Sequence, residues 1–96
     1  MQIDEIHKLE NALAQAHTPA ERLRLLNELS WNLISGQSQR ARSLAEEARQ
    51  LALEQQNEAG LAYSLLVIGS VDLEYGTTHE ALVYLKQAEE IFERIQ

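Results

Sequence analysis

The chain has 96 residues, 45% of them hydrophobic, which suits one small domain with a single core. It contains no Cys, which excludes disulfides, thiolate metal sites and Cys nucleophiles. The net charge of −7 disfavours nucleic-acid binding, because an acidic surface repels the phosphate backbone.

The first predicted element is an amphipathic helix at residues 3–16. Its apolar residues recur every three or four positions: Ile3, Ile6, Leu9, Leu13 and Ala16. The segment lacks the basic and apolar regions of a signal peptide, and no apolar run in the chain approaches the roughly 20 residues of a membrane helix. We therefore expect a soluble, cytoplasmic protein that does not contact a membrane.

A second helix is predicted to begin after Thr18 and to run to about residue 35. Thr18 and Glu21 have the spacing of a capping box, in which the hydroxyl accepts from the Glu21 amide and the carboxylate accepts from the Thr18 amide. Pro19 suits the first helical position, which needs no amide proton. Gly36 is expected to end the helix in the left-handed conformation.

Three further helices are predicted. Ser38 is expected to cap a helix at about residues 39–55, whose apolar positions are mainly Ala and allow a close approach between helices. Asn57 is expected to cap the fourth helix. Thr77 and Glu80 repeat the capping-box spacing at the start of the fifth.

The helices form a repeat with a period of 39 or 40 residues. Three small residues of one copy recur 40 positions later, Gly36, Ala41 and Ala48 as Gly76, Ala81 and Ala88. Such a period is typical of stacked helical repeats. We predict one all-α domain over residues 1–96, made of antiparallel helical hairpins, with 19–56 as repeat one and 58–96 as repeat two. Residues 3–16 are then the second helix of a partial repeat, or alternatively an unrelated capping helix.

The second copy resembles the tetratricopeptide repeat at Ile68-Gly69, Gly76, Glu80-Ala81, Leu85 and Ala88. In that family a small residue of the first helix meets an Ala of the second. The resemblance implies five helices stacked as a right-handed superhelix. The period of this chain is longer than the family's usual 34 residues. In this respect the chain resembles the longer-helix variants found in bacterial signalling and regulatory proteins.

The chain departs from the family pattern at several positions. Leu29 stands where the second copy has Gly69, which would space the helices of repeat one further apart. Asn32 and Asp72 replace the usual aromatic residue, and the closing Pro is absent from both copies. These two polar residues are interpreted as bonding helix ends or water, and the alternative is that they face a ligand's backbone amides.

The family resemblance implies a peptide-binding groove along the first helices of the two repeats. The implied contact residues are Leu26, Asn27, Ser30, Leu33, Tyr63, Leu66, Val67, Ser70 and Leu73, with Leu23 and Glu74 at the edges. Some members hold a C-terminal carboxylate with Lys, Asn and Arg. Leu26 and Ser30 stand where that clamp needs Lys and Asn, so we expect a mildly apolar groove instead.

The last helix has an apolar face wider than one packing surface requires. We expect this face to contact a further repeat or a second copy of the chain, through Leu82, Tyr84, Ile91 and Ile95. Trp31, the only Trp, is expected to pack between helices with its N–H at an edge. The alternative is that Trp31 is a surface anchor for a partner.

The sequence offers little that could carry catalysis. His7 and Glu10 lie three residues apart on a helix, but a tetrahedral metal site needs three or four ligands. No nucleophile elbow or phosphate loop is present. We expect neither enzymatic activity nor a cofactor or metal, and the alternative is an enzyme with a His/Glu metal site.

The expected function is that of a protein–protein interaction scaffold. By resemblance alone, the chain is interpreted as the N-terminal regulatory or sensory module of a bacterial signalling protein. The alternative is a stand-alone adaptor that binds a peptide in the groove. The expected partners are a protein or peptide, including a homodimer, and not nucleic acid or a membrane.

Overall fold

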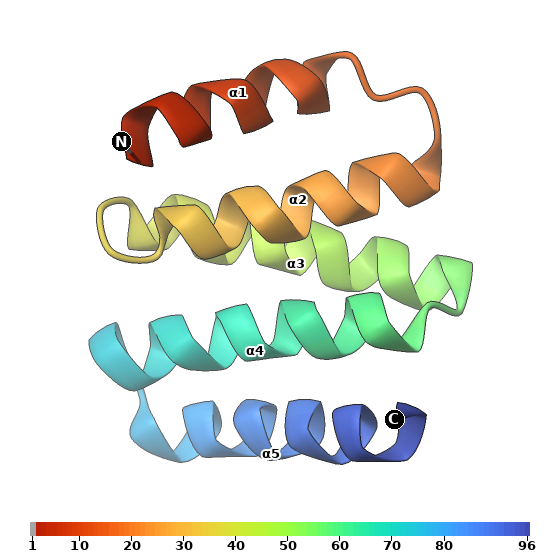
Figure 1. The fold of residues 1–96 in the computed structure, drawn as a ribbon. Coiled ribbons are helices and arrows are strands. Elements are labelled where there is room, and N and C mark those ends of the chain that lie inside the picture. The colour runs from red at the N-terminus through yellow and green to blue at the C-terminus, as the bar shows by residue number, and fades with distance from the viewer. Residues whose placement is uncertain (1) are drawn as a thin grey trace.

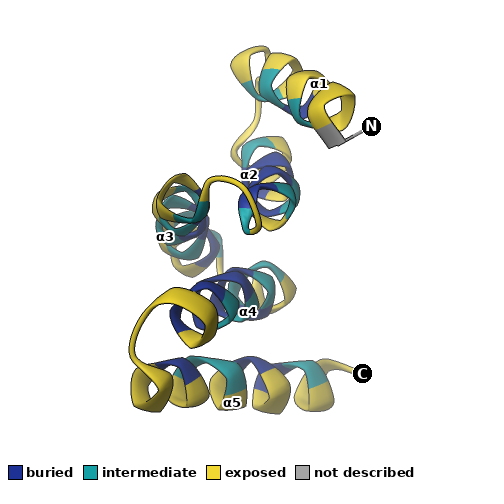
Figure 2. Cartoon of the chain, turned by 90° about the vertical axis from the view of Figure 1, so that its left-hand side faces the viewer, coloured by how far each residue is buried: buried dark blue, intermediate teal, exposed yellow. Residues whose placement is uncertain are grey.

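The computed structural model describes residues 2–96, with side chains from residue 3 onward. It contains five helices: α1 (Gln2–Ala14), α2 (Pro19–Leu33), α3 (Ser38–Gln55), α4 (Glu58–Tyr75) and α5 (Thr78–Ile95). Neighbouring helices run antiparallel and are stacked one after another (Figure 1). Seen end-on, α3 lies to one side of α2 and α4 (Figure 2). The described residues contain no strand, so the predicted all-α fold of stacked hairpins is confirmed.

The start of α2 has most of the predicted capping box. Thr18 is extended, and its hydroxyl accepts a hydrogen bond from the Glu21 amide at 3.1 Å. The Glu21 carboxylate accepts from the His17 amide at 3.1 Å, not from the Thr18 amide as predicted. The carboxylate therefore holds the loop before the helix rather than the cap residue.

The other three predicted caps have different outcomes. Asn57 accepts from the amide three residues later, at 2.8 Å, as predicted. Ser38 is the first residue of α3 rather than its cap, and Gln37 at the cap position forms no side-chain cap bond. The Thr77 hydroxyl donates to the Glu80 carboxylate at 3.0 Å, so the predicted bonds to backbone amides do not form at α5.

The predicted left-handed residue at Gly36 is wrong, because no glycine in the described residues has a positive φ. The helix ends earlier, at Leu33, and the Gln37 amide donates to the Leu33 carbonyl at 2.8 Å. That bond continues a right-handed turn, which needs no glycine. The left-handed residue is Gln56, with φ 54°, at the end of α3.

Helix α3 packs between α2 and α4. Its buried side chains are all Ala: Ala41, Ala45, Ala48 and Ala52. On one side, Leu23 and Leu26 of α2 pack against the last two. On the other, Val67 and Ile68 of α4 pack against Ala45. Because these side chains are small, both neighbouring helices can approach α3 closely.

The two hairpins are packed differently at equivalent positions. In α4 and α5, a Cβ added to Gly69 would lie 2.7 Å from Cγ of Leu85 and 3.2 Å from the Ala81 carbonyl oxygen. The two helices therefore approach closely at Gly69. In α2 and α3, the fully buried Leu29 takes this place and packs in a cluster with Ala41.

Helix α1 is held mainly by α2. Leu9 is buried against Leu25 and Leu29, and Ile6 and Leu13 pack at the edge of the same cluster. An ion pair at 2.6 Å joins Glu10 of α1 to Arg40 of α3. That α1 is the second helix of a partial repeat stays a prediction.

Candidate functional site

The structure places four of the nine predicted groove residues inside the fold. Leu26, Ser30, Leu33 and Val67 are each no more than 1% exposed. Leu26 and Val67 face the alanines of α3, and Ser30 donates to the Asn27 carbonyl at 3.0 Å. Their surfaces are used by neighbouring helices, so a partner cannot touch them in this conformation.

The remaining predicted groove residues have mixed exposure. Tyr63, Leu66 and Ser70 are half-buried on α4, and Leu73 is 49% exposed. Asn27 is only 4% exposed but lines a pocket. The part of the predicted groove that a ligand can reach therefore lies mainly on α4.

A pocket of about 390 Å³ lies between the start of α2 and the start of α4. Its lining comes from both repeats: Ala20, Leu23, Arg24, Asn27 and Glu28 with Asn57, Ala59, Gly60 and Tyr63. The two helices approach closely here, since a Cβ on Gly60 would lie 2.8 Å from Cδ2 of Leu23. The pocket exists only because the two hairpins stack.

Asn27 is one of the polar residues of this lining. Its Nδ2 donates to the Gly60 carbonyl at 3.2 Å, which links α2 to α4. Its Oδ1 is buried and has no hydrogen-bond partner. A buried acceptor without a donor costs about 1–3 kcal/mol, so this oxygen offsets part of the stability that the Nδ2 bond contributes.

Tyr63 of the pocket lining contacts a second aromatic residue, Trp31. The rings of Trp31 and Tyr63 meet edge to face with centroids 6.4 Å apart. Trp31 is 46% exposed, so the alternative of a surface residue describes it better than packing between helices. Such half-exposed aromatic pairs are suited to binding, because Trp and Tyr supply large contact areas at little entropic cost.

The pocket also carries charge. Arg24 donates to the Glu28 carboxylate at 2.9 Å along one face of α2. The pKa of the Tyr63 phenol is raised by burial and, to a smaller extent, by the negative charge of Glu28. The Arg24–Glu28 pair is an ordinary i,i+4 pair in sequence, so nothing in the sequence alone marked it as part of a pocket.

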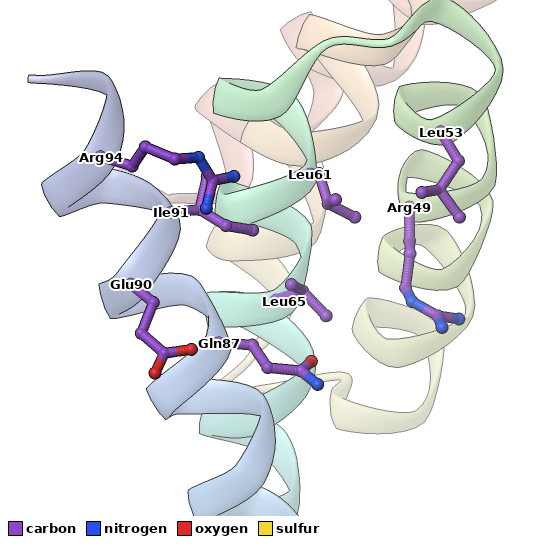
Figure 3. Close-up of a pocket in the computed structure, with 8 residues that line it drawn as sticks. All are labelled: Arg49, Leu53, Leu61, Leu65, Gln87, Glu90, Ile91 and Arg94. Atoms are coloured by element: carbon purple, nitrogen blue, oxygen red, sulfur yellow. The ribbon is translucent and has the colours of Figure 1, made fainter.

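A second pocket, of about 300 Å³, lies between α3 and α5, with Leu61 and Leu65 of α4 nearby (Figure 3). Arg49 and Arg94 stand on its two sides. Each is already paired, Arg49 with Glu46 at 3.2 Å and Arg94 with Glu58. Both guanidinium groups are thus engaged, and Glu90 is a charged side chain of the lining with no ion pair among the described residues.

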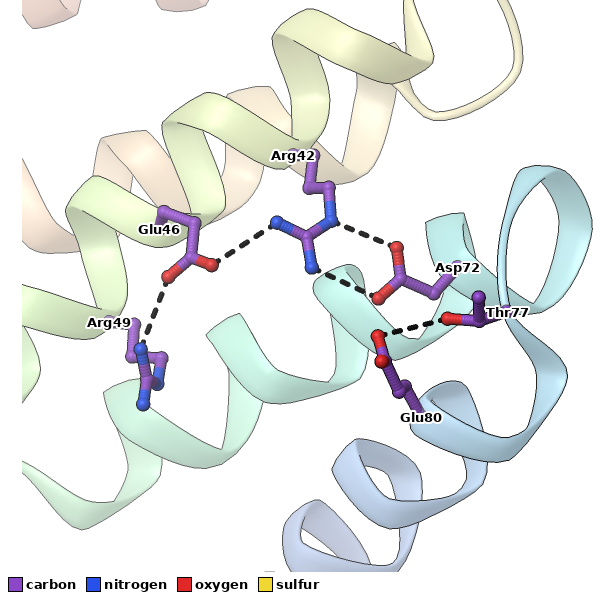
Figure 4. A network of polar contacts seen from close by, with 6 residues as sticks. All are labelled: Arg42, Glu46, Arg49, Asp72, Thr77 and Glu80. Carbon is purple, nitrogen blue, oxygen red and sulfur yellow. Dashed lines mark hydrogen bonds and ion pairs between the residues drawn. The ribbon is translucent and has the colours of Figure 1, made fainter.

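A polar network ties α3 to α4. Arg42 donates from Nε and Nη2 to the two carboxylate oxygens of Asp72, at 2.9 and 3.0 Å, and from Nη1 to Glu46 (Figure 4). The hydrogen bonds that Arg42 donates to Asp72 raise the pKa of Arg42 above its ordinary value, so it stays charged. Asp72 therefore holds the repeats together instead of facing a ligand or a helix end. Asn32 donates to the Glu28 carbonyl at 2.8 Å, the local backbone bond that was predicted for it.

The predicted self-association residues on α5 do not share one exposed face. Leu82 is 55% exposed, but Ile91 is buried against Ala62 and Leu65 of α4. Tyr84 is half-buried, and Ile95 lies about 140° around the helix from Leu82. The exposed large apolar side chains of α5 are therefore Leu82 and Val83 near its start and Ile95 at its end.

Among the described residues, no group of three or more His, Asp or Glu side chains could hold a metal ion. Glu10, the residue paired with His7 in the metal hypothesis, is engaged by Arg40. In the same part of the chain, no helix combines the length and apolarity needed to cross a membrane.

Comparison with protein-family models found no match to this chain, and comparisons with curated proteins and with solved structures found no significant match.

Proposed function

We propose that the protein is a tetratricopeptide-like scaffold that binds a segment of another protein along α2 and α4. The observation that carries this proposal is the pocket shared by the two repeats. Its lining includes the half-buried Tyr63, whose ring meets the exposed Trp31 edge to face. Stacked helical repeats commonly present such surfaces to extended or helical peptides.

The site favours protein binding over catalysis on chemical grounds. It offers hydrogen-bonding groups and aromatic surface, whereas it lacks an activated nucleophile or a paired acid and base. The acidic net charge of −7 favours a protein partner over nucleic acid.

The resemblance to long-period repeats of bacterial signalling proteins supports a role as a cytoplasmic regulatory or sensory module. The alternative is a stand-alone adaptor. An adaptor binds its peptide as this chain alone, whereas a regulatory module changes the activity of an attached output domain when the peptide binds. Fusing the chain to its genomic neighbour and measuring that activity separates the two roles.

The peptide proposal is tested with a displayed library of short linear peptides selected against the whole protein. Selected peptides should bind Trp31→Ala about tenfold or more weakly than wild type, as expected when an interface aromatic is truncated. Tyr75→Ala is the matched control, because Tyr75 is an exposed aromatic at the far end of α4 and should leave affinity unchanged. Failure to select any binder, or equal loss in both variants with intact circular dichroism, would contradict the proposal.

A second candidate is self-association through the first half of α5. Leu82 and Leu85 line a shallow hollow with Lys86 and Glu89, and two copies related by a two-fold axis could pair these opposite charges. Light scattering should then show a mass that rises with concentration, and Leu82→Glu should abolish the rise. Leu53→Glu, an equally exposed leucine on α3, is the control. A constant monomer mass overturns this candidate.

A further inference from the structure

The polar groups that the α2–α4 pocket can offer to a ligand are mainly hydrogen-bond donors. Asn57 accepts from the Gly60 amide through Oδ1, and its Nδ2 has no hydrogen-bond partner among the described residues. Burial raises the pKa of the Tyr63 phenol, so this hydroxyl stays protonated and can donate. Oδ1 of Asn27, the acceptor without a donor, is buried and does not reach a ligand.

The charges in the lining cancel. Arg24 donates from Nη1 to the Glu28 carboxylate at 2.9 Å, so the pair is close to neutral. The other N–H groups of the guanidinium remain available, because a guanidinium carries five and the Arg24 side chain is 60% exposed. The pocket therefore suits an uncharged ligand that presents hydrogen-bond acceptors.

Aromatic surface continues from the pocket along α2. The Tyr63 ring meets the exposed Trp31 ring at 79°, with centroids 6.4 Å apart. Trp31 follows Arg24 by seven residues, which places both side chains on one face of α2, roughly 10 Å apart along the axis. One turn of a polyproline II helix, three residues at about 3.1 Å each, covers nearly the same length.

We infer that this surface binds a proline-rich segment in the polyproline II conformation, an inference that rests on the proposed peptide-binding function. Proline has no N–H, and the carbonyls of a polyproline II helix make no internal hydrogen bonds, so the segment presents acceptors without donors. Arg24, Asn57 and the Tyr63 hydroxyl donate to these carbonyls, and a proline ring packs against Trp31. Grooves lined by aromatic residues commonly recognise such segments.

Other peptide conformations use this surface less fully. A helical segment satisfies its own carbonyls, which leaves the donors of the lining without partners. A β-strand brings an N–H with each carbonyl, but the Glu28 carboxylate already accepts from Arg24, and Oδ1 of Asn57 from Gly60. A polyproline II segment also loses less conformational entropy on binding, because its conformation is preformed.

The test uses two peptides of identical composition on the whole protein, acetyl-hexa-L-proline amide and its mirror image, acetyl-hexa-D-proline amide. Trp31 is the only Trp, so its fluorescence reports binding at this surface directly. The L-peptide should change the fluorescence until it saturates. The D-peptide forms a helix of the opposite hand and should bind at least about tenfold more weakly.

A pair of variants tests the hydrogen bonds. Tyr63→Phe keeps the ring and removes the hydroxyl donor, so it should weaken binding of the L-peptide about threefold to tenfold. Tyr75→Phe is the matched control, since it removes the same group from an exposed tyrosine at the far end of α4 and should leave affinity unchanged. Circular dichroism checks that both variants keep the helical fold.

Equal binding of the two mirror-image peptides, no saturable change in fluorescence, or equal loss in the two Tyr variants would overturn the inference. The displayed peptide library separates this failure from failure of the proposed function. If selected peptides bind through Trp31 but the L-proline peptide does not bind, the peptide-binding function stands and the preference for proline fails. If neither the library nor the L-proline peptide gives binding, both fail.

Discussion

The two hairpins, α2–α3 and α4–α5, differ in which helix supplies the large residue at their equivalent helix–helix contact. In the first, Leu29 of the leading helix meets the alanine-rich face of α3. In the second, Gly69 of the leading helix leaves room for Leu85 of α5. The large residue therefore comes from the leading helix in one hairpin and from the following helix in the other.

The largest effect is expected when the large residue of the first hairpin is truncated. Leu29→Ala should lower the free energy of unfolding by about 3 kcal/mol, because Leu29 is fully buried and its loss leaves a cavity. Leu85→Ala should cost less, since Leu85 is only half-buried. Urea unfolding followed by circular dichroism measures both, and an equal loss would contradict the stated difference between the hairpins.

Adding a methyl group at Gly69 in the second hairpin is expected to lower the free energy of unfolding by about 2 kcal/mol. In Gly69→Ala the new methyl group would meet Leu85 at 2.7 Å and must push the helices apart. Gly36→Ala is the control, because it meets nothing within 4 Å and should be neutral or stabilising by about 0.5 kcal/mol.

Combining Gly69→Ala with Leu85→Ala tests whether the space at Gly69 is limited by the Leu85 side chain. The double variant should be more stable than the sum of the single effects predicts, because the added methyl group enters the space left by the leucine. Additive losses would mean that Gly69 is required by the backbone and not by Leu85.

The two hairpins are connected by the ion pair between Arg42 of α3 and Asp72 of α4. The guanidinium group is partly exposed and the carboxylate is nearly buried. Arg42→Leu should destabilise the fold by about 1–2 kcal/mol, because it leaves Asp72 without its bidentate partner. The loss of stability is small because Arg42 is 33% exposed and solvent screens its charge. Arg24→Leu breaks an exposed pair and should change stability by less than about 0.5 kcal/mol. Thermal unfolding that ranks the two variants the other way would refute this difference.

The smallest expected effect is a gain in stability from a substitution at Gln56, in the turn that joins the two hairpins. Gln56 adopts a left-handed conformation, which costs a residue with a side chain about 1 kcal/mol relative to glycine. Gln56→Gly should therefore raise the free energy of unfolding by up to about that amount. A loss of stability in urea would show that the Gln56 side chain has a role of its own.

The sequence predicted the five helices well because their signals are local. The apolar spacing, Thr18 and Asn57 act within one or two helical turns, and the structure confirms them. The cap at Ser38 and the glycine stop at Gly36 failed for a local reason as well. Leu33 and Gln37 close the turn in a right-handed conformation, which the presence of a glycine does not exclude.

The candidate site was less predictable because it depends on how closely two hairpins stack. Family positions placed Leu26 and Val67 in a groove, but the alanines of α3 draw α2 and α4 inward and bury both. Asn27 was among the expected residues, whereas its unpartnered oxygen follows from the bond of its amide nitrogen to Gly60. The sequence did not indicate that Arg24 and Glu28 line a pocket, because an i,i+4 pair of opposite charges is typical of a solvent-exposed helix face.

The position of α3 between two helices has a consequence for how the molecule opens. Within the described chain each helix contacts only the next one or two, and α1 packs mainly on α2, with an ion pair to α3. Stability in such linear arrangements is distributed along the stack, and an end can detach without global unfolding. Backbone amides of α1 should therefore exchange with solvent deuterium fastest, and those of α3 slowest. The pocket between α2 and α4 would persist through fraying of α1, since both of its walls rest on α3.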